Sequence, residues 1–316
     1  MSITDKFTEA LVNDEMNKGL LRGYKVKSTN QVYDDYLYDD PQVQDTCWKQ
    51  LRNQMDQKHE EQYGKGSGGE LKEENDRPPK MAAFASSSRM IYTLSAVKNT
   101  IPNFRFEEQL PTTIAGVANM DGYQELDRRF TFVEAKCREP YSHSVKQAIK
   151  RNYKEVYSYL REKMPRVFSC VMEDIPDAPD GKEPQNKMNV VFFCHNRVVG
   201  AFDIKQMISH LLGVATKFLI MEKADREAVK RIQFLYLLYN PAGLQIQEPD
   251  RSEVMQIYED TCWCAEHYHF EEMFGYIVDY LAPQICPGAT GEELADLKAT
   301  FRFKLCDQNS YVKQFK

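Results

Sequence analysis

The stretch that decides the fold is RFTFVEAKCRE at residues 129–139, which follows IAGVANMDGYQEL at residues 114–126. Both runs are short, rich in aromatic and β-branched residues and bounded by Gly or Pro, as strands are. A third run of this kind, FRFEEQL, comes first, at residues 104–110. The three runs predict a β-meander, and Ser86-Ser87-Ser88 predicts the cap of a helix over residues 89–97 just before it.

Charged side chains stand near the ends of the last two predicted strands. Alternate side chains of a strand share a face, so Glu134 and Lys136 should point the same way, and an antiparallel return can bring Asp121 beside them. Carboxylate oxygens are the ligands that Mg²⁺ favours, and the metal can stabilise charge on a phosphoryl group. The three residues therefore predict a site for Mg²⁺ (or Mn²⁺), with Lys136 orienting or activating a water molecule.

The acid-x-Lys spacing also occurs elsewhere in the chain, for example beginning at Asp56, Glu70 and Asp203. The first two lie in a charged stretch without an apolar strand before them, and Asp203 is explained as a helix cap. Only Glu134-x-Lys136 ends an alternating strand with a second acid upstream. The structural alternative for this pair is an exposed ion pair on an edge strand.

Further elements follow downstream. FDIKQMISHLLGVATKFL at residues 202–219 predicts a helix, in which Asp203 and Gln206 stand in the capping-box relation. RIQFLYLLYNP at residues 231–241 predicts a buried strand. The tail predicts one long helix over residues 252–282, followed by a last strand.

We expect three regions along the chain: a helical extension over residues 1–54, a flexible charged loop or linker over residues 55–82, and an α/β domain over residues 83–316. In the linker, 12 of the 26 residues from 55 to 80 are charged, and GKGSGG interrupts the run. Within the domain, residues 141–200 form an expected insertion.

The insertion carries a local positive charge on an acidic chain. The net charge is −6, yet residues 141–166 hold seven basic and two acidic side chains. Their spacing predicts a basic helix over residues 143–163, which can contact nucleic acid. The residues predicted to contact DNA are Lys146, Lys150, Arg151 and Lys154. The alternative is an ordinary solvated helix face.

Apolar runs are too short to cross a bilayer, and the amino terminus lacks the basic and apolar segments of a secretory signal. We therefore expect a cytoplasmic protein without a membrane partner. The eight cysteines are then expected to be reduced thiols.

The segment Cys262-x-Cys264-x-x-His267-x-His269 resembles a zinc ligand set. Helix neighbours meet at spacings of three and four residues, so these side chains cannot all converge on one continuous helix. We favour a helix packed through its cysteines, and keep a zinc-stabilised interaction protein as the alternative.

Asp121 followed by Glu134-x-Lys136 after an apolar strand resembles the signature of the PD-(D/E)xK nuclease superfamily. The order FEEQLP, ANMDGY, FVEAKCREPY, KQMISHLLG and FLYLLYNP is similar to bacterial restriction-endonuclease-like proteins, over roughly residues 84–241. The resemblance departs from the pattern in the insertion at 141–200 and in Met120, which stands where the motif has proline.

The resemblance implies an α-β-β-β-α-β core, a mixed sheet flanked by helices, and Mg²⁺-dependent, restriction-type cleavage of DNA. Asp121, Glu134 and the Ala135 carbonyl would hold the metal, Lys136 would act on the attacking water, and Gln206 resembles a common helper. A homodimer is a further expectation.

One more ligand is expected from the first strand. Alternation allows only one of Glu107 and Glu108 to face the site, and we favour Glu108. The alternative function is a catalytically silent module that kept the nuclease fold for DNA binding or assembly.

Overall fold

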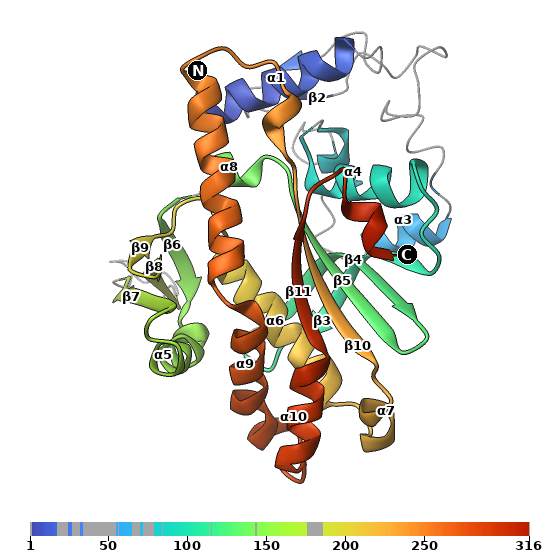
Figure 1. The fold of residues 1–316 in the computed structure, drawn as a ribbon, viewed down its shortest axis with the longest axis vertical. Coiled ribbons are helices and arrows are strands. Elements are labelled where there is room, and N and C mark those ends of the chain that lie inside the picture. Colours follow the sequence, from blue (N-terminus) through green and yellow to red (C-terminus); the bar gives the residue numbers. More distant parts are fainter. Residues whose placement is uncertain are drawn as a thin grey trace, which may run out of the picture.

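A five-stranded mixed sheet lies at the centre of the computed structural model (Figure 1). Its strand order is β11-β10-β5-β4-β3. The bounds are β3 (Phe104–Pro111), β4 (Val117–Leu126), β5 (Arg129–Lys136), β10 (Arg231–Leu238) and β11 (Phe301–Cys306). Strands β3, β4 and β5 are antiparallel neighbours, while β10 pairs in parallel with both β5 and β11. The predicted meander and the α/β class are confirmed.

The structure describes residues 2–17, 25–26, 32–33, 55, 57–64, 70–71, 79–83, 85–114, 116–142, 144–175 and 186–315. Most of the predicted extension over residues 1–54 and much of the predicted linker over residues 55–82 therefore lie outside the described residues.

Helices cover both faces of the sheet because its strands alternate apolar side chains between them. Phe130 and Phe132 face α6 (Ile204–Leu219) and α9 (Phe270–Ile285) in the largest apolar core. Val133 and Ala135 pack on the other side, with Ile91 of α4 (Ser87–Tyr92). Helix α4 continues as the π-helical turn η2 (Thr93–Val97). The sheet is thus buried on both sides.

The insertion forms a second, smaller sheet to one side of the molecule (Figure 1). Its elements are β6 (Lys146–Lys150), η4 (Arg151–Tyr153), α5 (Lys154–Lys163), β7 (Phe168–Asp174), β8 (Lys187–Cys194) and β9 (Arg197–Val198). The prediction of one basic helix over residues 143–163 is therefore wrong. In KQAIK, Gln147 and Ile149 are buried and their neighbours exposed, a period of two that suits a strand.

The C-terminal part contains α7 (Lys223–Glu227), η5 (Pro241–Gly243), α8 (Asp250–His267), α10 (Gly291–Thr300) and η6 (Tyr311–Phe315). The single helix predicted over residues 252–282 is wrong, because α8 ends at His267 and α9 begins at Phe270. His269 has a left-handed φ of 51° between them, and Tyr268 is fully buried. Burial of this tyrosine turns the chain.

Pieces of the N-terminal region pack against this body. They are α1 (Ile3–Asn17), α3 (Gln57–Gly64) and η1 (Lys80–Ala82), while β1 (Lys25–Val26) and β2 (Val32–Tyr33) pair with each other and β2 contacts α1. Helix α1 touches the turn η3 (Glu139–Ser142), where Phe7 stacks on Tyr141 with ring centroids 4.3 Å apart. Helix α3 lies within the predicted linker, and its Gln62 side chain accepts a hydrogen bond from the Phe106 amide of edge strand β3. How the chain divides into domains stays a prediction.

In the described residues, no helix is long and apolar enough to span a membrane.

The close approach of α6 to the β3–β4 hairpin is testable at Gly213. An added Cβ there would lie 2.9 Å from Leu110 Cβ and 3.0 Å from Ala118 Cβ, and neither atom can swing away. Gly213→Ala should therefore destabilise the protein by about 1–2 kcal/mol in urea unfolding, because overpacking outweighs the gain in helix propensity.

The matched control is Gly275→Ala in α9, where the new Cβ would meet only the flexible Lys298 side chain, with Cδ at 3.5 Å and Cγ at 3.9 Å. This variant should gain up to ~1 kcal/mol from helix propensity. Equal effects at the two positions would contradict the packing described.

Candidate active site

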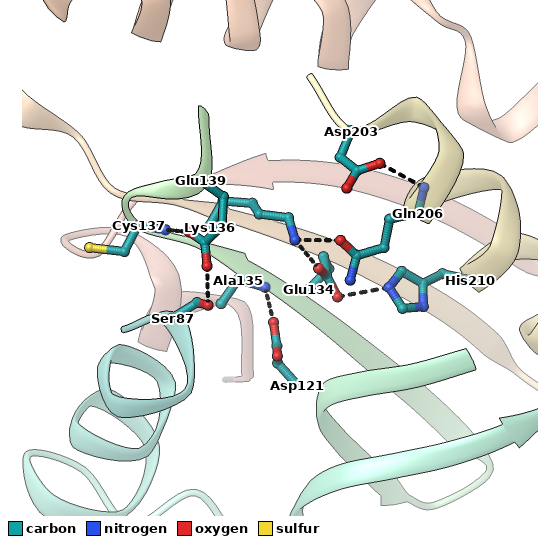
Figure 2. Close-up of polar contacts among 10 residues, drawn as sticks. All are labelled: Ser87, Asp121, Glu134, Ala135, Lys136, Cys137, Glu139, Asp203, Gln206 and His210. Atoms are coloured by element: carbon teal, nitrogen blue, oxygen red, sulfur yellow. Dashed lines mark hydrogen bonds and ion pairs between the residues drawn. The ribbon is translucent and has the colours of Figure 1, made fainter. Parts of the chain in front are cut away.

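Asp121 lies where strands β4 and β5 part. The ladder pairs Gly122 with Val133 and does not continue beyond that pair. There, Asp121 Oδ2 accepts a 2.7 Å hydrogen bond from the Ala135 amide (Figure 2). Because the N–H and C=O of one strand residue point to the same side, the Ala135 carbonyl faces this gap as well. The parting of the strands thus exposes one carboxylate and one carbonyl.

Glu134 and Lys136 share a face of β5, as predicted, and both are buried. Lys136 Nζ donates to Glu134 Oε1 at 2.5 Å and to Gln206 Oε1 of α6 at 2.6 Å. The Gln206 amide donates to Asp203, the N-cap of α6, at 2.9 Å. Gln206 therefore serves both the cap, through its backbone, and the lysine, through its side chain. The edge-strand alternative is wrong, since β5 lies between β4 and β10.

His210 is a site residue that the sequence analysis missed. Its Nε2 lies 2.9 Å from Glu134 Oε2, with 2% of the His210 side chain exposed. The two atoms are close enough to hydrogen-bond, but both also lack a well-aligned hydrogen bond, so we treat the contact as a bent polar pair. Figure 2 shows Gln206 and His210 on the same side of α6. Their spacing of four residues on a helix was the available signal.

Glu107, and not Glu108, faces the site, so the prediction of Glu108 as a metal ligand is wrong. Glu107 is buried in the cavity, whereas Glu108 pairs with Arg105 at 2.9 Å. Glu107 has a left-handed φ of 51°, which interrupts the pleat. Phe106 and Glu107 are buried in succession, so simple alternation picks the wrong glutamate.

Glu107, Asp121, Glu134, Lys136 and Gln206 line one cavity of about 380 Å³. It also contains charged groups from the N-terminal region, with Glu70 and Lys80 paired at 3.0 Å. The remaining polar lining includes Asn119, Ser87, Arg138 and Glu139. Ser87 donates to Glu139 at 2.7 Å, and Glu139 also accepts from the Cys137 amide, as Figure 2 shows. These contacts tie the start of α4 to the end of β5.

The acids of the cavity have shifted pKa values: those of Glu107 and Asp121 are raised, and that of Glu134 is lowered. Burial, and then the charges of Glu70 and Glu134, raise the pKa of Glu107 to about 8. Desolvation, and then Glu134 and Glu107, raise the pKa of Asp121 well above its usual value. Burial alone would raise the pKa of Glu134, but Lys136 and His210 outweigh it and lower the pKa to about 2.

Lys136 is held as a cation. Burial lowers its pKa, but the Glu134 carboxylate outweighs this effect, and the pKa is raised well above the usual value. The cavity therefore contains an ionised Glu134–Lys136 pair, beside two acids that repel one another.

The donor set suits a hard cation such as Mg²⁺. All candidate donors are oxygens: the carboxylates of Asp121, Glu134 and Glu107 and the carbonyl of Ala135. Two buried acceptors of the cavity, Asn119 Oδ1 and Glu70 Oε2, lack a hydrogen-bond partner. A bound cation would relieve the repulsion that raises the pKa values of Asp121 and Glu107. In the part of the chain that is described, no three His, Cys, Asp or Glu side chains already surround a metal position, so binding requires side-chain movement.

The predicted DNA-contacting residues lie outside this cavity, in the layer of the smaller sheet. Lys146 Nζ lies 2.8 Å from Glu173, and Asp174 lies 3.2 Å from Arg151 and 3.8 Å from Lys154. Carboxylates thus partly neutralise the basic surface. Within the described residues, Lys150 is exposed and has no ion-pair partner.

The cysteine and histidine segment lies mainly on α8, which is continuous through His267. Cys264 packs into the main core, and Cys262 is partly buried against it. Among the described residues these side chains do not form a metal-ligand group. Helical packing of this segment is confirmed up to His267.

Comparison of the chain with protein-family models, curated proteins and solved structures gave no match. Function therefore has to be inferred from the chemistry of the cavity.

The raised pKa of Glu107 leads to a pH-dependent test. Its folded-state pKa of about 8 lies above the ordinary value of 4.5, so the folded protein keeps a proton that the unfolded chain releases between these values. Wild-type stability should therefore fall as the pH rises from about 4.5 to about 8. Glu107→Gln should remove this loss and be more stable than wild type at about pH 9, by up to a few kcal/mol, since one pKa unit corresponds to about 1.4 kcal/mol.

Urea unfolding in EDTA at about pH 5 and about pH 9 checks this expectation. Glu108→Gln is the control, because its carboxylate lies outside the cavity. An identical difference from wild type at both pH values would show that Glu107 does not hold the extra proton.

Proposed function

We propose that the chain is a Mg²⁺-dependent (or Mn²⁺-dependent) nuclease of the PD-(D/E)xK type, which hydrolyses phosphodiester bonds of DNA in the manner of a restriction endonuclease. The observation that carries the proposal is the cavity in which Asp121, from one strand, meets the buried Glu134–Lys136 pair of the next. A carboxylate on one strand and an acid-x-lysine pair on the next, placed where the two strands part, suit metal-dependent hydrolysis of a phosphodiester bond.

The arrangement of elements supports the same proposal. Helix α4 is followed by the meander β3–β4–β5, then by α6, and then by β10, which pairs in parallel with β5. This order, with the short helix α7 between α6 and β10, agrees with the α-β-β-β-α-β order expected of a restriction-endonuclease-like core. The insertion between β5 and α6 adds the smaller sheet without separating the three candidate residues.

Asp121, Glu134 and the Ala135 carbonyl would hold the metal, with Glu107 as a further ligand. When bound, the cation supplies positive charge that stabilises the phosphoryl group and lowers the pKa of a water molecule. Lys136 holds its proton at Nζ and would orient the attacking water and donate a hydrogen bond to a phosphate oxygen. These roles require Lys136 to exchange part of its contact with Glu134 for one with substrate.

Helix α6 supports the pair from behind. Gln206 keeps Lys136 Nζ directed along the face of β5, and His210 fixes the second oxygen of Glu134. In this role Gln206 and His210 are positioning residues. The basic side chains of the smaller sheet would contact the DNA backbone, which fixes position without selecting sequence.

One observation favours the alternative, a catalytically silent nuclease-fold module for DNA binding or assembly. Lys136 Nζ lies 2.5 Å from one oxygen of Glu134 and His210 Nε2 lies 2.9 Å from the other, as in a polar network with a purely structural role. The cationic Lys136 and the raised pKa values of Asp121 and Glu107 beside it favour an enzyme more strongly, because perturbed pKa values gather at functional sites. Location in the cytoplasm and a homodimer stay predictions.

Lys136→Ala separates the two functions. If Lys136 serves the chemical step, the variant should cut a plasmid at least ~100-fold more slowly in Mg²⁺, while its affinity for DNA in EDTA changes little. Lys205→Ala is the control, since Lys205 is an exposed lysine of the same helix as Gln206. A wild-type enzyme that cuts nothing in Mg²⁺ or Mn²⁺ would leave the silent module as the better account.

Changes in the basic surface should affect DNA binding, in contrast to Lys136→Ala, which should affect the cleavage rate. Replacing Lys146, Lys150 and Lys154 by Ala should weaken DNA binding and flatten its salt dependence by up to ~0.9 in log-log slope per lost phosphate contact on duplex DNA. Lys150→Ala should account for much of the change, because Lys146 and Lys154 already have carboxylate neighbours. Affinity across a salt series measures this, with exposed Lys230→Ala as control. An unchanged slope in the triple variant would exclude this surface.

A further inference from the structure

A second cavity of about 330 Å³ adjoins the candidate active site. The turn η3 separates the two: Glu139 and Ser142 line the first cavity, and Pro140 and Tyr141 line the second. A single 3₁₀ turn advances the chain only ~2 Å per residue. The two cavities therefore lie on either side of one turn of chain.

One wall of the second cavity is a stack of planar groups. The Arg197 guanidinium lies over the Trp263 ring, with its carbon 4.3 Å from the ring centroid. Trp263 in turn stacks on His267, at 4.4 Å between centroids and 17° between planes. Asp260 lies beside the stack, with Oδ1 3.5 Å from Arg197 and accepting a 3.0 Å hydrogen bond from Gln256. The wall combines a flat cationic surface with a carboxylate acceptor.

The opposite rim is apolar and open to solvent. Val145 and Val198 line the cavity with 43% and 54% of their surface exposed. They are two of six large hydrophobic residues that are exposed in the described part of the chain. Ligand pockets are lined mainly by apolar side chains, with a few polar groups that fix the orientation of the ligand.

We propose that this cavity binds one unpaired nucleobase of a DNA strand whose phosphate lies in the neighbouring active site, an inference that rests on the proposed function. The faces of the base would lie between the Arg197–Trp263 stack and the valine rim, since guanidinium planes and aromatic side chains stack on bases. Asp260 would accept from an exocyclic amine of the base. At 330 Å³ the cavity is near the lower limit for ligand pockets, and one base fits within this volume.

This site would make the protein selective for strands with an unpaired or extruded base beside the cleavage position. A base inside a duplex cannot reach such a pocket without leaving the stack. The base-binding cavity would thus add selectivity to a basic surface that contacts only the DNA backbone.

Trp263 provides the measurement, because the chain has one other tryptophan, Trp48. In a Trp48→Phe background and in EDTA, a single-stranded DNA oligomer should quench the emission of Trp263. The same oligomer built from abasic sugars should cause no quenching and should bind roughly 5- to 150-fold more weakly, as expected for the loss of one stacked base.

Gly200→Leu tests the cavity itself. An added Cβ at Gly200 would lie 3.5 Å from Val145 Cγ2, so a leucine side chain would enter the cavity and should abolish the difference between the two oligomers. The controls Gly200→Ala and Gly288→Leu, the latter on an open surface, should keep the difference in binding between the two oligomers. Arg197→Gln, at an exposed position, should reduce this difference. It keeps the test valid if the Gly200→Leu variant misfolds.

Equal binding of the two oligomers by the parental protein, or a difference that survives in both Gly200→Leu and Arg197→Gln, would overturn the base-binding site. Cleavage in Mg²⁺ is measured separately. Base-dependent quenching without cleavage would contradict only the nuclease proposal, and cleavage without base dependence would contradict only the base-binding site.

Discussion

A glutamate and a lysine buried together between a sheet and a helix constrain the rest of this structure. Burying an ion pair costs more than the attraction returns unless both groups gain further polar contacts. Here Gln206 supplies a contact to Lys136 and His210 supplies one to Glu134, and both come from α6. The helix must therefore lie against β5 at one position along its axis. Gly213, one turn beyond His210, allows the close approach to Leu110 and Ala118 that this position requires.

The same constraint gathers negative charge at one end of the sheet. Burial raises the pKa values of Asp121 and Glu107, and the nearby Glu134 carboxylate raises them further. Glu107 also has a left-handed backbone conformation, and such strain persists only where the surrounding structure enforces it. Repulsion and strain at one point make the folded chain less stable than it could be. The proposed binding of a divalent cation would offset the repulsion between these carboxylates.

The sequence predicted the parts of the fold that follow a regular period. The meander, the shared face of Glu134 and Lys136, and the cap at Asp203 are all present because alternation and capping act locally. Glu107 was missed because a left-handed residue breaks the alternation on which the choice of Glu108 rested. Strand β6 was missed because its buried residues, Gln147 and Ile149, lie among lysines that dominate the charge pattern. His210 was missed because only its spacing of four residues from Gln206 places it on the same side of the helix, and its partner Glu134 is distant in the sequence.

The most direct test of the central claim is the anomalous diffraction of a crystal soaked in Mn²⁺. The account predicts a peak in the cavity between Asp121 and Glu134, with carboxylate oxygens and the Ala135 carbonyl at about 2.1 Å, the ligand distance of a small hard cation. It also predicts that Lys136 moves away from Glu134 to allow this. A cavity that stays free of manganese at millimolar Mn²⁺, with Lys136 still bound to Glu134 and Asp121 still bound to the Ala135 amide, would contradict it.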